Sequence, residues 1–240
     1  AADPPKPRSK PGQVAPGIVA RTLGPDGVLS RVVDSFEHRP EQARMAEAVA
    51  NAFEKGQHLI VEAGTGTGKS MAYLLPSILH SLVGGKRVVI STHTINLQEQ
   101  LAGKDIPDAL AALAHEGGLP LGEFRAALLK GRANYLCLAR FAALRKSERL
   151  SVAEARTLAK ILVWLQATST GDRSEMSLLA VEERLWDGLS SRGAKECIGA
   201  EPACFLRAAR ERAEAAHILI VNHALLLADA AVGGALLPEY

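Results

Sequence analysis

The chain carries Glu62-Ala63-Gly64-Thr65-Gly66-Thr67-Gly68-Lys69-Ser70 directly after a short apolar run, Leu59-Ile60-Val61, and directly before an apolar segment that begins at Met71. A strand, a glycine-rich loop and a Lys-Ser pair at the start of a helix together predict a cradle for nucleotide phosphates. Glycines let successive backbone N–H groups point at one anion, and the N-terminus of the helix adds unpaired donors and partial positive charge.

In this loop we expect Lys69 to reach the β- and γ-phosphates of ATP and the Ser70 hydroxyl to hold Mg²⁺. The residues predicted to contact the nucleotide are Ala63, Gly64, Thr65, Gly66, Thr67, Gly68, Lys69 and Ser70. Ala63 stands where the strict spacing asks for glycine, and its small side chain suits a backbone cradle if φ there is negative. A plain glycine-rich connector does not explain a Lys-Ser pair at a helix start.

The composition is that of an ordinary globular protein, with 240 residues, 48% hydrophobic and 22% charged, and a net charge of +2. No apolar stretch approaches the roughly 20 residues of a membrane span, and the Pro- and Lys-rich N-terminus is not a secretory signal. Three cysteines argue against a disulfide framework and fit a reducing compartment, so we expect a cytoplasmic protein. The net charge alone neither indicates nor excludes nucleic acid as a partner.

Predicted strands alternate with predicted helices over most of the chain, which indicates an α/β fold with a mainly parallel sheet covered on both faces. The predicted strands are residues 58–62, 87–91, 124–129 and 217–222, and the helices between them are residues 40–56, 69–82 and 95–103. Residues 1–16 are rich in Pro, Lys and Gly and predict an extended linker, which we extend to residue 21.

From 134 to 216 the alternation gives way to Leu-, Ala- and Arg-rich helical periodicity. This stretch is too long for a simple connection within an α/β domain. We therefore expect a helical insertion with a small core of its own around Trp164 and Trp186.

Arg39 and Gln42 lie about twenty residues before the loop in the sequence and are candidates to bind adenine. A glutamine amide can donate and accept in one plane, and Phe36 with Arg39 could bracket the base by stacking. The alternative is that both side chains are solvated on a helix face.

Small polar residues follow two of the predicted strands. Thr92, His93 and Thr94 come after the second strand, where hydroxyls and backbone N–H groups would suit a nucleic-acid phosphate or merely cap the next helix. Asn222-His223 after the last strand could contact a ligand or cap a helix.

The insertion is bordered by cysteines, Cys137 at its start and Cys197 and Cys204 near its end. If the fold brings both ends together, the thiolates suggest a metal or iron–sulfur site. Buried free cysteines acting as small hydrophobes are the alternative, and three ligands are one short of the usual four. Glu214-Ala215-Ala216-His217 superficially matches an Asp-Glu-Ala-His box, but Ala213 replaces the carboxylate and the stretch precedes its strand.

Five segments, in this order, resemble the DinG/XPD-type iron–sulfur DNA helicases of superfamily 2, and the DinG branch most closely. They are FEHRPEQARM, VEAGTGTGKS, VVISTHTINLQEQL, LLKGRANYLC and CFLRAARERAEAAHILIVNHALLLAD. The resemblance implies a RecA-like first motor domain at 22–133 and 217–240, interrupted by an iron–sulfur domain at 134–216. It also implies an ATP- and Mg²⁺-dependent motor that moves 5′→3′ on single-stranded DNA, opens duplexes and junctions, and is associated with the nucleoid.

Two departures from the family pattern matter. The cysteine expected between Cys197 and Cys204 is missing, so a 4Fe-4S cluster would need another ligand, such as Glu201, or be incomplete or absent. The Asp-Glu-Ala-His box is expected just after Tyr240, so we expect a fragment of a longer protein that binds ATP but hydrolyses it poorly. In some relatives an exonuclease domain precedes the motor.

The candidate DNA contacts are Thr92, His93, Thr94, Lys130, Arg132 and Tyr135, through phosphate contact and stacking. Two other functions compete with a helicase. A redox-responsive DNA-binding module would use its ATP loop only for regulation, and a small-molecule P-loop kinase would turn over ATP without DNA.

Overall fold

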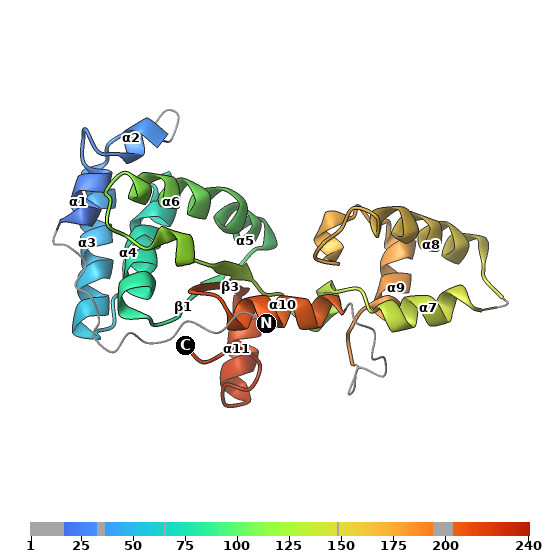
Figure 1. The fold of residues 1–240 in the computed structure, drawn as a ribbon. Helices are drawn as coiled ribbons and strands as arrows, with labels where there is room; N and C mark the ends of the chain where they lie inside the picture. Colours follow the sequence, from blue (N-terminus) through green and yellow to red (C-terminus); the bar gives the residue numbers. More distant parts are fainter. Residues whose placement is uncertain (1–16, 33–36, 65, 148, 194–203) are drawn as a thin grey trace. The chain divides into compact units, whose positions relative to one another are not determined.

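The computed structural model describes residues 17–32, 37–64, 66–147, 149–193 and 204–240. They form two compact units, drawn in Figure 1, which divide the chain at Leu128/Leu129 and again at Arg212/Ala213. The second unit, Leu129–Arg212, falls close to the predicted insertion at 134–216.

The first unit is an α/β structure and the second is helical. The elements of the first unit are α1 (Ile18–Leu23), α2 (Leu29–Val32), α3 (Pro40–Lys55), α4 (Lys69–Gly84), β1 (Val88–Thr92), α5 (Ile95–Gln100), the π-helix η1 (Leu101–Asp105), α6 (Ile106–Ala114), the 3₁₀ turn η2 (Leu121–Glu123), β2 (Ala126–Leu128), β3 (Ile218–Asn222) and α11 (His223–Ala231). Those of the second are η3 (Arg132–Asn134), α7 (Leu138–Arg145), α8 (Val152–Trp164), η4 (Arg173–Glu175), α9 (Ala180–Leu189) and α10 (Phe205–Glu214), which ends in the first unit.

The sheet of the first unit has the strand order β1-β3-β2, and both pairings are parallel. Ile218 pairs with Val88 on one side and with Ala126 on the other. The apolar residues of β3 are completely buried, as expected for the central strand of a parallel sheet. The predictions of parallel strands at 87–91, 124–129 and 217–222 are therefore confirmed.

Helices cover both faces of this sheet. Because side chains alternate along a strand, Ile218 and Ile220 face one side, where they join a core built largely from α4 and α6. Leu219 faces the other side, and α11 contacts β3 and β1. Figure 1 shows α5 and α6 on one side of the strands and α11 on the other.

The N-terminal boundary and one helix differ from the prediction. The linker was expected to reach residue 21, but α1 begins at Ile18, and Ile18 and Leu23 are buried in the core of the first unit. The helix predicted at 95–103 ends its regular part at Gln100 and continues as the π-helix η1. Residues 1–16 lie outside the described part of the chain.

The second unit has its own core, as the sequence predicted. Trp186 is 2% exposed and packs edge-to-face on Trp164, with ring centroids 6.1 Å apart. Ser151 and Glu154 form a reciprocal capping box at the start of α8. No helix within the described residues combines the length and the apolar character needed to cross a bilayer.

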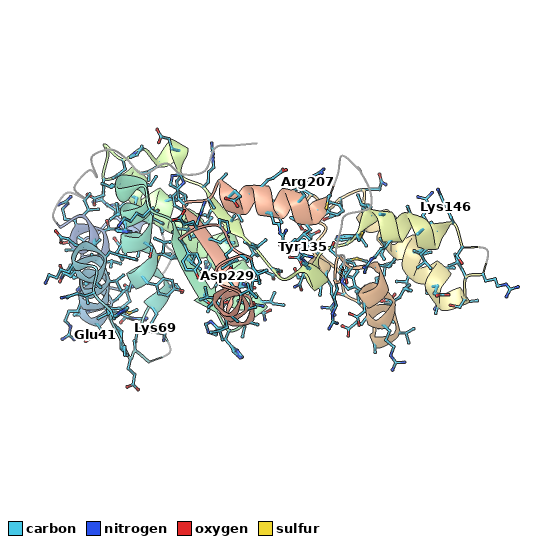
Figure 2. The ribbon with its side chains drawn as sticks, turned by 90° about the horizontal axis from the view of Figure 1, so that it is seen from below. Glu41, Lys69, Tyr135, Lys146, Arg207 and Asp229 are labelled. Atoms are coloured by element: carbon cyan, nitrogen blue, oxygen red, sulfur yellow. The ribbon has the colours of Figure 1, made fainter. Side chains whose placement is uncertain are left out.

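Asp229, labelled in Figure 2, lies on α11 and binds the segment that follows this helix. The side chain is fully buried, and its Oδ1 accepts hydrogen bonds from the Leu236 and Leu237 N–H groups at 2.8 and 2.9 Å. The Tyr240 hydroxyl donates to Oδ2 at 3.2 Å. Burial raises the pKa of the Asp229 carboxyl, but the hydrogen bonds outweigh burial and hold the pKa below its ordinary value.

We expect Asp229→Asn to lower the melting temperature at neutral pH, because the amide offers no charge to these donors. A carboxyl with a lowered folded pKa stabilises the protein above its unfolded pKa of about 4, and this stabilisation is lost as the pH falls through the folded pKa. Melting curves from neutral pH to about pH 3 should therefore converge in acid. The exposed Asp26→Asn is the control, and a gap that stayed constant with pH would contradict this role.

Candidate nucleotide-binding site

The loop before α4 contains two glycines in a backbone conformation that other residues rarely adopt. Gly66 and Gly68 have φ angles of +79° and +73°, in the left-handed region that favours glycine. The Thr67 hydroxyl donates to the Gly64 carbonyl at 3.0 Å and closes the turn. A Cβ added at Gly64 or Gly66 would meet nothing within 4 Å, so there is open space beside both residues. Thr65 lies outside the described residues.

Lys69 is folded back onto the loop that it follows. Its ammonium group donates to the Ala63 carbonyl at 2.9 Å and also to the Gly64 carbonyl. A bound phosphate would have to replace these two carbonyls as the acceptor for Nζ. Ser70 lies in the first turn of α4. Burial raises the pKa of Tyr73, one turn further along the helix, and the Ser70 side chain offsets part of the rise.

Gln42 of α3 lies against the loop, but its amide is engaged by the backbone. The side chain is 5% exposed, and Nε2 donates to the Gly68 carbonyl at 2.8 Å. A Cβ at Gly68 would lie 2.1 Å from this nitrogen, so glycine is required there by the contact as well as by φ. Arg39 pairs with Glu37 at 2.9 Å, and Phe36 lies outside the described residues. Recognition of adenine by Gln42 and Arg39 stays a prediction.

The apolar run before the loop is not a strand, so the prediction of a strand at 58–62 is wrong. Ile60 is 98% exposed, and Leu59 and Val61 are each 42% exposed. The physical reason is the lack of a partner. β1 pairs with β3 along one edge, and its other edge pairs with no described strand and faces α4 across a cavity of about 1310 Å³.

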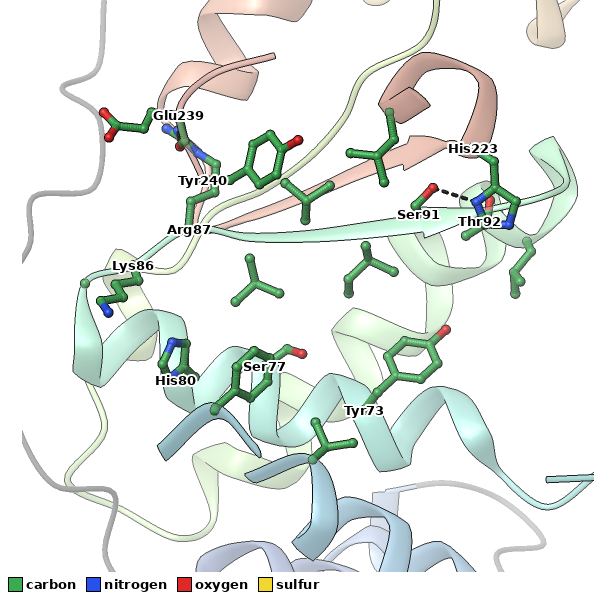
Figure 3. Close-up of a pocket in the computed structure, with 18 of the residues that line it drawn as sticks. Tyr73, Ser77, His80, Lys86, Arg87, Ser91, Thr92, His223, Glu239 and Tyr240 are labelled. Atoms are coloured by element: carbon green, nitrogen blue, oxygen red, sulfur yellow. Dashed lines mark hydrogen bonds between the residues drawn. The ribbon is translucent and has the colours of Figure 1, made fainter. Parts of the chain in front are cut away.

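The loop nevertheless lies on the side of the sheet where α/β proteins bind ligands. Figure 3 shows Tyr73, near the start of α4, toward the Thr92 end of the cavity, and His80 toward the Lys86 and Arg87 end. The helix therefore runs opposite to β1, and its N-terminus is on the side of the carboxyl ends of the strands.

Thr92 and Thr94, two of the predicted DNA contacts, both form hydrogen bonds within the turn between β1 and α5. Thr92 is 4% exposed, and its hydroxyl donates to the Thr94 carbonyl at 3.0 Å. Thr94 caps α5 by accepting a hydrogen bond from the Leu97 N–H group at 3.3 Å. Capping by Thr94 is therefore confirmed, and contact with DNA by Thr92, His93 and Thr94 stays a prediction. His93, between the two threonines, is exposed.

A contact that sequence reasoning missed joins Ser91 to His223. Ser91 Oγ lies 2.7 Å from His223 Nδ1, and the rings of His93 and His223 are 6.2 Å apart. Asn222 caps α11 by accepting from the Leu225 N–H group at 2.8 Å. The two strand ends are neighbours because Ser91 pairs with Val221 in the parallel register, a relationship that the separate motifs did not reveal.

The structure corrects two predicted DNA contacts in the second unit. The Lys130 side chain is 2% exposed, and its ammonium lies 2.6 Å from Asp172 Oδ2 and 2.8 Å from Ser174 Oγ. Tyr135 is 2% exposed, its hydroxyl accepts from the Lys130 N–H group, and burial raises its pKa to about 12. A buried ammonium and a buried ring cannot reach DNA in this structure, whereas Arg132 is exposed.

Cys137 and Cys204 are the two described cysteines, and a residue next to each of them contacts Gly171. The Leu136 N–H group donates to the Gly171 carbonyl at 3.0 Å, and a Cβ at Gly171 would come within 2.2 Å of the Phe205 ring. Cys137 and Cys204 adjoin these two contacts, so both ends of the insertion reach the same part of the second unit.

The donor set does not match an iron–sulfur cluster of the usual four-thiolate kind. Cys197 and Glu201 lie outside the described residues. Among the residues that are described, no three His, Cys, Asp or Glu side chains are grouped to hold a metal ion. The whole chain has three cysteines, one fewer than such a cluster uses.

The buried ion pair of Lys130 and Asp172 allows a prediction about the stability of the second unit. Asp172→Ala leaves the Lys130 ammonium buried without its carboxylate, and we expect a loss of about 3–5 kcal/mol in unfolding free energy. The double substitution Lys130→Met with Asp172→Leu should recover most of that loss, because it removes both charges. Denaturant unfolding measures both. Equal stability of Asp172→Ala and the unsubstituted protein would show that the pair is not formed.

The sequence of this chain is similar to those of known helicases. The DEAD/DEAH box helicase family matches residues 39–106, which include α3, the loop, α4 and β1. The ATP-dependent helicase DinG of Mycobacterium tuberculosis H37Rv is 40% identical over 221 residues, covering 84% of this chain and 32% of that protein. The ATP-dependent DNA helicase YoaA of Escherichia coli K12 is 40% identical over 230 residues, covering 90% and 34%.

The 3′-5′ exonuclease DinG of Bacillus subtilis 168 is 34% identical over 218 residues, covering 90% of this chain and 23% of that protein. The chain thus spans about a third or less of the length of these relatives. Within that span, the chain is similar to the DinG and YoaA helicases, and its residues 39–106 match the DEAD/DEAH box helicase family.

Proposed function

We propose that this chain is the ATP-binding part of an ATP-dependent DNA helicase with a RecA-like motor domain. The observation that carries the proposal is the loop ending in Lys69-Ser70 at the start of α4, on the carboxyl-end side of a parallel sheet. The names of the DinG and YoaA relatives support the same activity.

Each residue of the loop has a separate role in binding the triphosphate. Lys69 leaves the carbonyls of Ala63 and Gly64 and donates to the β- and γ-phosphates, and the open space beside Gly64 and Gly66 accommodates them. The Ser70 hydroxyl would hold Mg²⁺, whose charge offsets that of the phosphates. Gln42 fixes the Gly68 peptide and thereby the start of α4.

Single-stranded DNA and DNA junctions are the proposed substrates, with movement in the 5′→3′ direction. His93, at the carboxyl end of β1, and Arg132 in the second unit are exposed cationic or hydrogen-bonding groups that suit DNA phosphates. ATP turnover coupled to DNA requires closure of a second motor domain onto the loop, so the 240-residue chain alone should hydrolyse ATP slowly.

Lys69→Ala should weaken ATP binding at least about tenfold, because it removes a charged hydrogen-bond donor to the phosphates. In the full-length protein it should also abolish ATPase activity stimulated by single-stranded DNA. Titration with a fluorescent ATP analogue and a steady-state ATPase assay measure the two effects. Lys55→Ala, at the far end of α3, removes the same charge from an exposed position and is the control.

Unchanged turnover in Lys69→Ala would contradict the proposal outright. Turnover that is lost in Lys69→Ala but does not respond to DNA in the unsubstituted protein would instead favour a small-molecule kinase. ATP binding without DNA-stimulated turnover in the full-length protein would favour a DNA-binding module in which the loop is only regulatory.

A further inference from the structure

Leu136, Gly171 and Phe205 join the two ends of the helical insertion within the second unit. The Leu136 N–H group, near the first end, donates to the Gly171 carbonyl at 3.0 Å. Near the other end, the Phe205 ring packs so closely on Gly171 that an added Cβ would lie 2.2 Å from the ring. The φ angle of Gly171 is +65°, so the backbone conformation favours glycine as well. We call these three residues the Gly171 junction.

Hydrogen bonds within the second unit also hold the backbone around Cys137. The Cys137 N–H group donates to the Leu189 carbonyl at 2.9 Å, and the Ser191 N–H group donates to the Tyr135 carbonyl at 2.9 Å. Because the N–H group that precedes Cys137 binds Gly171, this stretch is held between two other segments of the same unit.

Apolar packing and a buried ion pair support the junction. Leu136 is 1% exposed and belongs to the core of the second unit, and Phe205 packs against that core. Asp172, the residue after Gly171, forms the buried ion pair with Lys130 at 2.6 Å. Both kinds of contact are costly to break, because they would expose apolar surface or leave a buried charge without its partner.

The donor set is too small for an iron–sulfur cluster at these two ends. Such clusters are held by four Cys thiolates, or by two Cys and two His in one class. The chain has three cysteines in all, and no three His, Cys, Asp or Glu side chains are grouped within the described residues. Metal ligands supply folding energy where packing alone does not. Here backbone hydrogen bonds and the Phe205 contact already join the two ends.

We propose that the insertion of this chain folds without an iron–sulfur cluster and that the Gly171 junction joins its two ends in place of metal ligands. The proposal goes beyond the helicase function proposed above and does not depend on it. It replaces the iron–sulfur domain that the sequence resemblance implies for residues 134–216 with a helical domain held by packing. Removal of iron should then leave the structure of the unit unaffected.

The first test measures iron in the full-length protein, produced with ample iron and purified without oxygen. We expect well below one iron atom per chain and no visible charge-transfer absorbance. The melting temperature should be the same with and without an iron chelator. Cys137→Ser and Cys204→Ser remove a thiolate at little cost in volume, and both should leave the iron content and the melting temperature unchanged.

The second test measures the junction by tryptophan fluorescence of the 240-residue chain, whose two tryptophans, Trp164 and Trp186, both pack in the second unit. Gly171→Ala should lower the melting temperature by at least about 5 °C, because its methyl group collides with Phe205 and φ is positive. The same substitution should cost less when combined with Phe205→Ala, which removes the colliding ring. Gly188→Ala is the control, because a Cβ there meets nothing within 4 Å.

Iron bound in a cluster of any size that Cys137→Ser removes would overturn the inference and leave the proposed ATP site intact. A melting temperature that falls on chelation, or that falls in Cys137→Ser as far as in Gly171→Ala, would also overturn it. If Gly171→Ala were as stable as Gly188→Ala, the junction would not be what joins the two ends.

Discussion

The parallel pairing of β3 with β1 and β2 is the constraint on which the described site depends. The apolar residues of β3 are completely buried. The register of its neighbouring strands therefore cannot slip without exposing the core or burying polar groups. This register brings Thr92 beside Asn222 and aligns the carboxyl ends of both strands. The polar turns that follow the strands then lie together at one edge of the sheet.

The loop before α4 is organised by a different set of contacts. It joins no paired strand, and its geometry comes from α4 and from the Gln42 amide, which packs so closely on Gly68 that no side chain fits there. Lys69 closes the loop from within by donating to two of its carbonyls. On the proposed function, a bound phosphate would replace these two carbonyls as the acceptor for the Lys69 ammonium.

Local periodicity predicted much of this fold. The apolar runs 87–91 and 217–222, the helix that begins at Pro40 and the small core around Trp164 and Trp186 all form where they were expected. These predictions succeed because each depends on residues close in the sequence. The run 58–62 has an equally apolar pattern but stays exposed, since a strand also needs a neighbour to pair with.

Predictions about the site failed where a distant partner decides the role of a side chain. Lys130 resembles a phosphate contact until Asp172, in another part of the second unit, neutralises it in the interior. Ser91 and His223 are 132 residues apart, and only the parallel register makes them neighbours. Neither contact can be predicted from a single sequence, because both join residues that are far apart in the sequence and become neighbours only in the folded chain.

The central claim, that the loop grips a triphosphate through Lys69, is tested most directly by an experimental structure with Mg²⁺ and a non-hydrolysable ATP analogue. We predict that Nζ of Lys69 leaves the Ala63 and Gly64 carbonyls and contacts the β- and γ-phosphates, with Ser70 at the metal. An analogue bound elsewhere, or a Lys69 that still donates to its own loop in the complex, would contradict the account.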